Sequence, residues 1–203
     1  MKRVTALLGS CLIILSLAGV AVAQTQTILT DVWKDKEYVS TAKKIAVFWI
    51  DQDKARRIII EDEFMRQLKA RGIDALPVYV VIPPDKMVDK EAALTKIRNL
   101  GAGAVLTVRM VSKETVQSQI PDPAKKDTGE SSRWSGYYHY VYDTPTRDKD
   151  EPAYIETIFF DSTTEQRVWA ARSVSKIEVA NLEVVTSIIK SLIDRLASDK
   201  MIK

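Results

Sequence analysis

The stretch Lys43-Lys44-Ile45-Ala46-Val47-Phe48-Trp49-Ile50 decides the fold. A continuous apolar run bounded by charge is typical of a strand that is covered on both faces. Asp51-Gln52-Asp53 ends this strand, and a helix is predicted from Lys54 to Arg71 because Ile60, Phe64 and Leu68 recur four residues apart, with Gly72 as the C-terminal cap.

The same alternation of strand and helix continues along the chain. Ala75–Ile82 is a second β-branched run, closed by Pro83-Pro84, which cannot donate to a β-ladder. Asp89–Leu100 has a helical apolar stripe that ends at a glycine, and Ala104–Val111 is a third strand. Strands that alternate with helices predict a parallel or mostly parallel sheet with right-handed crossovers.

The second half of the chain has a different pattern. Residues 118–152 are polar and contain several prolines, apart from an aromatic segment, which predicts a long irregular loop. Tyr154–Phe160 and Arg167–Ile177 read as a β-hairpin, and an apolar period of 3.6 residues predicts a last helix over about Glu178–Asp199. We therefore expect one α/β domain with a mixed sheet over residues 43–203, and an extension over residues 24–42 that packs on it.

The amino terminus predicts export. Lys2 and Arg3 precede an apolar stretch that exits through Ala21-Val22-Ala23, the pattern of a cleaved signal peptide over residues 1–23. The mature protein is then periplasmic or exported. Two alternatives remain open, an uncleaved membrane anchor and a lipoprotein acylated at Cys11, either of which would attach the protein to a membrane.

Composition narrows the function classes. The chain has 203 residues, one His and one Cys, with a formal net charge of +3. Loss of the signal removes Lys2, Arg3 and Cys11, so the charge falls to +1 and a nucleic-acid partner loses its main support. Zinc sites and most hydrolytic triads need more His or Cys than His139 alone. We expect no cofactor and no resident metal, and the sequence does not determine the oligomeric state.

Asp51 and Asp53 are the strongest candidates for chemistry. They follow the first strand, where α/β folds place their sites, and two carboxylates could hold Mg²⁺ for phosphoryl transfer. This pattern loosely resembles the first motif of the haloacid dehalogenase phosphatases, although Ala55 stands where that family has Thr or Val. The simpler interpretation is a polar turn in which Asp53 caps the following helix.

An aromatic segment, Trp134–Tyr142, is the candidate partner-binding surface. Read as a strand or hairpin arm, it places alternate rings on one face, where they could dock a partner or stack on a glycan. The alternative is that the rings cover the domain's own core. The candidate residues are Trp134, Tyr137, Tyr138, Tyr140 and Tyr142.

Four segments carry a resemblance to a known family. They are the opening strand Lys44–Ile50, the helix and strand entry Glu63–Leu76, the stretch Leu100–Leu106 and the hairpin Phe159–Trp169, with its Asp161, Thr164 and Trp169. Together they resemble a family of small bacterial envelope proteins, often lipoproteins, whose fold is similar to the amino-terminal domain of TolB, to CsgG and to LpoB. Gly103 stands where that family usually has Asp.

The resemblance implies a function without catalysis. Such domains act as adaptor, assembly or regulatory parts of envelope machinery, with envelope proteins as partners and possible outer-membrane association. We therefore expect a non-enzymatic interaction module, with a metal-dependent phosphohydrolase that uses Asp51 and Asp53 as the alternative.

The signal-peptide interpretation predicts where the mature chain begins. We expect mass spectrometry of the protein from soluble periplasm to give a chain that starts at Gln24, because the small residues Ala21 and Ala23 fit signal cleavage. A membrane species that begins at an acylated Cys11 would contradict this prediction.

Overall fold

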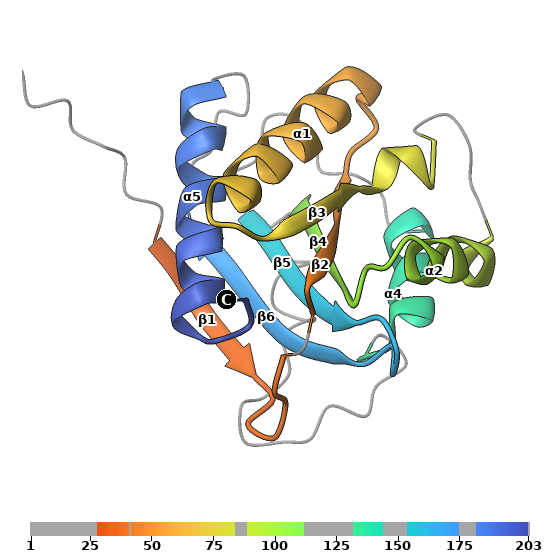
Figure 1. Cartoon of the computed structure of the whole chain (residues 1–203). Coiled ribbons are helices and arrows are strands. Elements are labelled where there is room, and N and C mark those ends of the chain that lie inside the picture. The colour runs from red at the N-terminus through yellow and green to blue at the C-terminus, as the bar shows by residue number, and fades with distance from the viewer. Residues whose placement is uncertain are drawn as a thin grey trace, which may run out of the picture.

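A six-stranded mixed sheet with helices on both faces forms the domain (Figure 1). The structure, a computed structural model, describes residues 28–40, 42–83, 89–111, 132–143, 154–174 and 182–202. The strand order is β1-β6-β5-β4-β2-β3. The predicted α/β class, with a mixed sheet in a single domain, is confirmed.

Three strands are parallel and three complete the sheet by antiparallel pairing. β2 (Lys44–Ile50) lies between β3 (Asp74–Pro77) and β4 (Ala104–Val111), parallel to both. β5 (Tyr154–Asp161) runs antiparallel to β4, and β6 (Arg167–Val174) forms the predicted hairpin with β5. The continuous apolar sequence of β2 is explained by its central place, since the side chains on both of its faces are buried.

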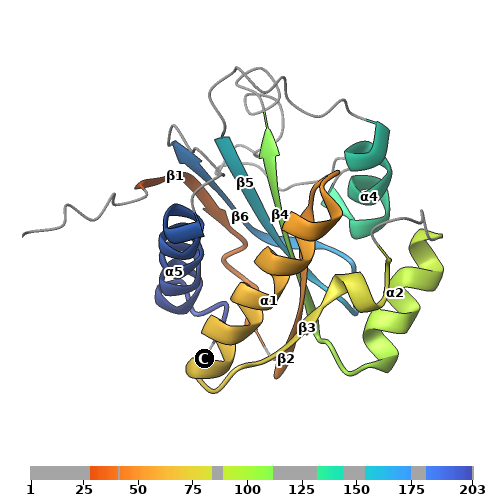
Figure 2. The same cartoon turned by 90° about the horizontal axis from the view of Figure 1, so that it is seen from above.

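Helices cover both faces of this sheet (Figure 2). α1 (Lys54–Ala70) and α5 (Leu182–Ser198) lie on one face, and α2 (Lys90–Asn99) and α4 (Trp134–Asp143) lie on the other. Two cores result, one on each side of the sheet. The predicted helices that correspond to α1, α2 and α5 are confirmed in type. α1 ends one residue earlier than predicted, α2 is one residue shorter at each end, and α5 is described from Leu182 to Ser198.

Glycines end two of these helices as expected. Gly72 and Gly101 have φ of +77° and +84°, in the left-handed region that follows a helix and that costs other residues energy. The backbone of Gly101 donates to the Arg98 carbonyl, so the chain turns at once toward β4.

The extension before residue 43 contributes a strand that the sequence did not reveal. β1 (Ile28–Lys34) pairs antiparallel with β6 and forms one edge of the sheet. Its ladder is interrupted by a register shift between Thr30 and Trp33, where Asp31 has φ of +50°. The bulge explains why the segment lacks a regular alternation of apolar residues.

Two predicted strands are wrong in extent or type. The run Ala75–Ile82 is a strand only as far as Pro77, and Val78–Val80 is a turn of 3₁₀ helix, η1. The segment Trp134–Tyr142, predicted as a strand arm, is helix α4, which lies within the predicted irregular loop 118–152. Its aromatic residues Trp134, Tyr137 and Tyr138 have the spacing i, i+3, i+4, which buries them along one side of a helix.

Some predictions fall outside the described residues. These are the signal peptide, residues 1–23, and the parts of loop 118–152 on either side of residues 132–143. None of the helices within the described residues has the length and apolar content to span a bilayer.

Candidate functional site

The sheet has one topological switch point, between β2 and β4. From β2 the chain crosses one face of the sheet through α1 and reaches β3, the neighbour of β2 on one side. It then crosses the other face through α2 and reaches β4, the neighbour of β2 on the other side. Open α/β sheets bind ligands beyond the carboxyl ends of their strands at such points. Asp51, directly after β2, and Arg109, opposite Ile50 in β4, mark this end of the sheet.

Asp51 is fixed by several hydrogen bonds. Arg56 donates to its carboxylate from Nε at 2.5 Å and from Nη2 at 2.8 Å, and the indole of Trp49 donates at 3.0 Å. The backbone N–H of Asp53 donates at 2.9 Å. Burial alone would raise the pKa of Asp51, but the hydrogen bonds from Arg56, Asp53 and Trp49 outweigh it and lower that pKa.

Asp53 caps α1. Its side chain accepts from the backbone N–H of Arg56 at 3.0 Å, which confirms the capping interpretation. The two carboxylates therefore have separate structural roles. Within the described parts of the chain, no cluster of three or more His, Cys, Asp or Glu could hold a metal ion.

A buried ion pair that the sequence does not reveal lies in the first turns of α1. Glu61 is fully buried, and Arg57 donates to it from Nε at 2.9 Å. The same carboxylate accepts from the backbone N–H groups of Trp49 in β2, at 3.1 Å, and of Tyr79 in η1, at 2.7 Å. Glu61 thus joins three elements at the carboxyl end of β2.

Arg57 completes this arrangement. Its Nη2 donates to the Ile82 carbonyl at 2.9 Å, and its guanidinium lies 4.8 Å from the centre of the Phe48 ring. Burial raises the pKa of Glu61 to about 7, although Arg57 and the two backbone N–H groups oppose the rise. The spacing of four residues could have suggested the pair from sequence, but not that it is buried.

A second buried pair lies on the face of the sheet that α2 and α4 cover. Arg109 and Glu156 face each other across β4 and β5, and their Nε and Oε1 atoms are 2.9 Å apart. The Tyr137 hydroxyl donates to the same oxygen at 2.8 Å, and Arg109 lies 5.4 Å from the centre of its ring. Burial and the negative charge of Glu156 raise the pKa of Tyr137 well above its usual value.

Arg172 extends this row of charges to β6. It lies opposite Glu156 in the sheet, and its Nη1 is 3.6 Å from the Asp31 carboxylate in β1. Its buried Nε has no hydrogen-bond partner among the described residues. Burial lowers the pKa of Arg172 despite the nearby carboxylates of Asp31 and Glu156.

The aromatic residues proposed for partner binding split into two groups. Trp134, Tyr137 and Tyr138 are at most 3% exposed and pack against Phe48 and Phe160, with ring centroids 5.3–6.3 Å apart. These three rings therefore belong to the core, as the alternative interpretation held. The side chains of Tyr140 and Tyr142 lie outside the described part of the chain.

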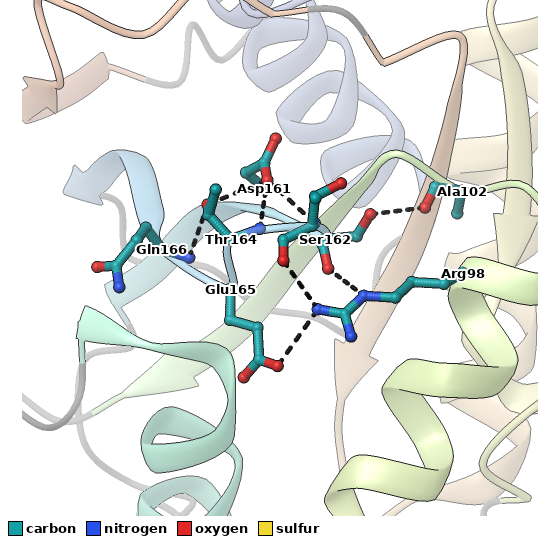
Figure 3. Close-up of polar contacts among 8 residues, drawn as sticks. Arg98, Ala102, Asp161, Ser162, Thr164, Glu165 and Gln166 are labelled. Atoms are coloured by element: carbon teal, nitrogen blue, oxygen red, sulfur yellow. Dashed lines mark hydrogen bonds and ion pairs between the residues drawn. The ribbon is translucent and has the colours of Figure 1, made fainter.

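The hairpin turn that carried the family resemblance is a fixed structural unit (Figure 3). Asp161 accepts from the backbone N–H groups of Thr163 and Thr164, at 3.0 and 2.8 Å. Arg98 of α2 donates to the Ser162 carbonyl and, at 3.2 Å, to Glu165, which has φ of +64°. These contacts account for the Asp and Thr of the motif by turn geometry.

Two further residues of the resemblance are also structural. The indole of Trp169 donates to Asp199 at 2.8 Å, which ties the end of α5 to β6. A Cβ at Gly103 would lie 3.2 Å from the Ala42 Cα, just before β2. This close approach of the Ala42 backbone explains why glycine stands at a position where the family usually has Asp.

In its first two turns, α1 buries charged side chains and exposes apolar ones. While Arg57 and Glu61 are buried, Ile58 and Ile59 are 37% and 53% exposed. Ala55 is exposed one turn earlier on the same side, and Val80 of η1 is 49% exposed. We call Ala55, Ile58 and Ile59, which share one side of α1, the α1 patch.

The interior holds a void between the sheet and helices α1 and α5. Its volume is about 10 Å³, which is room for at most about one water molecule. The lining is apolar and consists of Trp49, Phe64, Ile155, Val185, Ile188, Ile189 and Leu192. A small-molecule site needs roughly 300 Å³ or more, so this void is a packing defect.

Comparisons with known proteins give likenesses at the level of solved structures. No family model matches the chain, and no curated protein matches it. A PelC dodecamer from Paraburkholderia phytofirmans, a single-substitution variant, is 18% identical with a TM-score of 0.43, over 81% of this chain and 96% of the PelC chain. A second PelC dodecamer from this organism is 16% identical with a TM-score of 0.43, over 85% and 98%. The resemblance to the TolB, CsgG and LpoB fold stays a prediction.

The buried pair in α1 predicts a pH-dependent loss of stability. We expect Arg57→Met to lower the free energy of unfolding by about 3–5 kcal/mol at pH 8, because Glu61 must then either stay charged in the interior without a counter-charge or take up a proton there at a cost. The pKa of Glu61 in the folded variant should lie even further above its unfolded value. The variant should therefore regain stability as the pH falls to 5.5 and Glu61 takes up a proton.

Chemical denaturation at the two pH values measures this effect. Arg66→Met is the matched control on the same helix, because Arg66 pairs with Glu63 at the surface, and it should show no such pH dependence. An Arg57→Met loss that is equal at both pH values would show that Glu61 does not depend on Arg57.

Proposed function

We propose that this chain is a non-enzymatic interaction module of the bacterial cell envelope, exported after signal cleavage near Ala23. It docks on other envelope components, with envelope proteins among the expected partners, through the α1 patch. The observation that carries the proposal is the inverted polarity of α1, where two isoleucines face solvent above a buried Arg57 and Glu61.

This inversion supports a docking role on energetic grounds. Burial of a charged pair costs several kcal/mol per ion before its contacts are counted, whereas isoleucine is the residue that an inward position favours. An apolar patch that reaches solvent despite this preference is typical of an interaction surface. Places where local sequence rules fail tend to be functional.

The contacts of the buried and half-buried carboxylates also favour an interaction module. Asp51 is held by Arg56 and the Trp49 indole, and Asp53 is used as a helix cap. Glu61 and Glu156 each accept from an arginine and from at least one other donor. Each of these carboxylates has a structural role that explains its presence.

Site-specific photocrosslinking in cells tests the docking proposal. We expect a photoreactive residue at Ile59 to give crosslinks to envelope components, because Ile59 is the more exposed of the two isoleucines in the α1 patch. The matched control is Val39, which is 79% exposed in the connection between β1 and β2. Equal crosslinking at both positions, or none at Ile59, would refute the role of the patch.

The alternative, a phosphohydrolase that uses Asp51 and Asp53, has a direct test. A site that binds Mg²⁺ only in the folded state adds about 2.7 kcal/mol of stability at a hundred times its Kd. We expect no thermal shift with Mg²⁺ or Mn²⁺, since Arg56 already neutralises Asp51. A shift that disappears in Asp51→Asn would favour the enzyme.

A further inference from the structure

Opposite charges flank the α1 patch. Lys54, Ile58 and Asp62 follow one another at a spacing of four residues, so they lie along one ridge of α1, and all three are exposed. The ridge is therefore basic before Ile58 and acidic after it. Ala55 and Ile59 form the neighbouring ridge and widen the apolar middle. α1 is an outer element of the domain, which leaves this side open to a partner (Figure 2).

Lys54 and Asp62 have no ionic partner among the described residues of their own chain. Asp62 accepts from the Tyr79 hydroxyl at 2.8 Å, a contact that leaves its charge in place. Arg66, one turn further along, donates twice to Glu63, at 2.7 Å each. Lys54 and Asp62 cannot reach each other, because eight residues of helix separate them by about 12 Å.

The other charges at the start of α1 are already engaged. Asp53 is exposed beside Lys54, but its carboxylate accepts from the backbone N–H of Arg56 and lies at the positive end of the helix dipole. The Arg56 side chain is held by Asp51. Lys54 and Asp62 are therefore the two charges on this side of α1 that an incoming surface could pair.

The order of these charges is complementary to itself. Two copies of α1 that pack antiparallel about a two-fold axis at Ile58 place Lys54 of each copy opposite Asp62 of the other, because both residues lie four positions from the axis. The two Ile58 side chains meet at the axis, with Ala55 and Ile59 beside them. One symmetric contact thus covers the apolar residues and gives both charges a partner. A parallel pairing would instead set each charge against its like.

From this complementarity we infer that the α1 patch binds a second copy of the same chain, as an antiparallel two-fold dimer. The inference rests on the proposed docking role of the patch and names its partner. Ile58 and Ile59, at 37% and 53% exposed, offer on the order of 200 Å² per copy, whereas a standard interface has about 800 Å² on each side. The dimer is therefore weak and reversible, with an expected Kd of roughly 10 µM to 1 mM.

Sedimentation equilibrium of the purified mature protein at low ionic strength measures this Kd. We expect Lys54→Glu to weaken self-association about ten-fold, because each of the two ion pairs becomes a repulsion. Asp62→Lys should weaken it by a similar factor for the same reason. An equal mixture of the two variants should associate about as tightly as the wild type, because the acidic variant then faces the basic one at both contacts.

Lys36→Glu and Glu37→Lys are the matched controls. They change exposed residues in the connection between β1 and β2 and alter the net charge by the same amounts. Each control alone, and their mixture, should associate as the wild type does. This comparison separates the proposed contact from a general attraction between oppositely charged proteins.

A further variant tests the apolar part of the contact. We expect Ile58→Ser to weaken self-association about ten-fold, because both copies lose their side chain at the axis. Thermal unfolding checks the fold of each variant, since Asp62→Lys also loses the bond from Tyr79. Lys54→Glu and Ile58→Ser leave that bond in place, so they test the dimer even if Asp62→Lys does not fold.

The outcomes distinguish this inference from the proposed function. A wild type that stays monomeric up to about 1 mM, or a dimer that Lys54→Glu and Ile58→Ser do not weaken, would overturn the dimer. If Ile59 then crosslinks in cells to a different envelope protein, the docking function stands with that partner. A crosslinked product of two copies of the chain supports both proposals. If the protein is monomeric and Ile59 gives no crosslinks, both proposals fall.

Discussion

The arrangement of the domain depends on the buried carboxylate of Glu61. It accepts from β2, from η1 and from Arg57, so it fixes α1 over the end of the central strand. Since an ionised group cannot be left alone in the interior, Arg57 must be buried beside it. These two positions occupy the inner side of the first turns of α1, and Ile58 and Ile59 are consequently turned outward. One polar constraint thus shapes both the interior and the exposed surface.

A second buried pair, on the face that α2 and α4 cover, uses the same solution. Glu156 accepts from Arg109 and from Tyr137, and the buried arginines Arg57 and Arg109 each lie against an aromatic ring. The Phe48 ring beside Arg57 packs in turn against the Trp134 ring. Buried charges at the edges of an aromatic core restrict how the helices can pack, because any other register would leave a charge without its partner. We interpret the pairs as devices that select one packing.

The features that resemble a family describe a scaffold. Asp161 forms a turn, Trp169 holds the last helix, and Gly103 allows close approach of two chain segments. Such roles explain why a fold can be recognised without an activity. The proposed functional surface instead lies on α1, where the sequence pattern departs from what the fold requires. The scaffold and the proposed surface are therefore formed by different residues. The same scaffold could bind a different partner if the exposed residues of α1 were different.

The sequence by itself determined the central strand, the parallel β-α-β-α-β order, the hairpin and the cap at Asp53, because apolar periodicity and turn chemistry are local. It did not determine β1, whose bulge hides the alternation, or helix α4, whose aromatic residues fit a strand as well as a helix. The sequence also did not reveal the candidate site on α1. Three consecutive isoleucines, Ile58–Ile60, and a common i, i+4 ion pair do not show which side chain turns inward. Only the tertiary structure decided this, because burial of Glu61 depends on backbone donors from β2 and η1, which are distant in sequence.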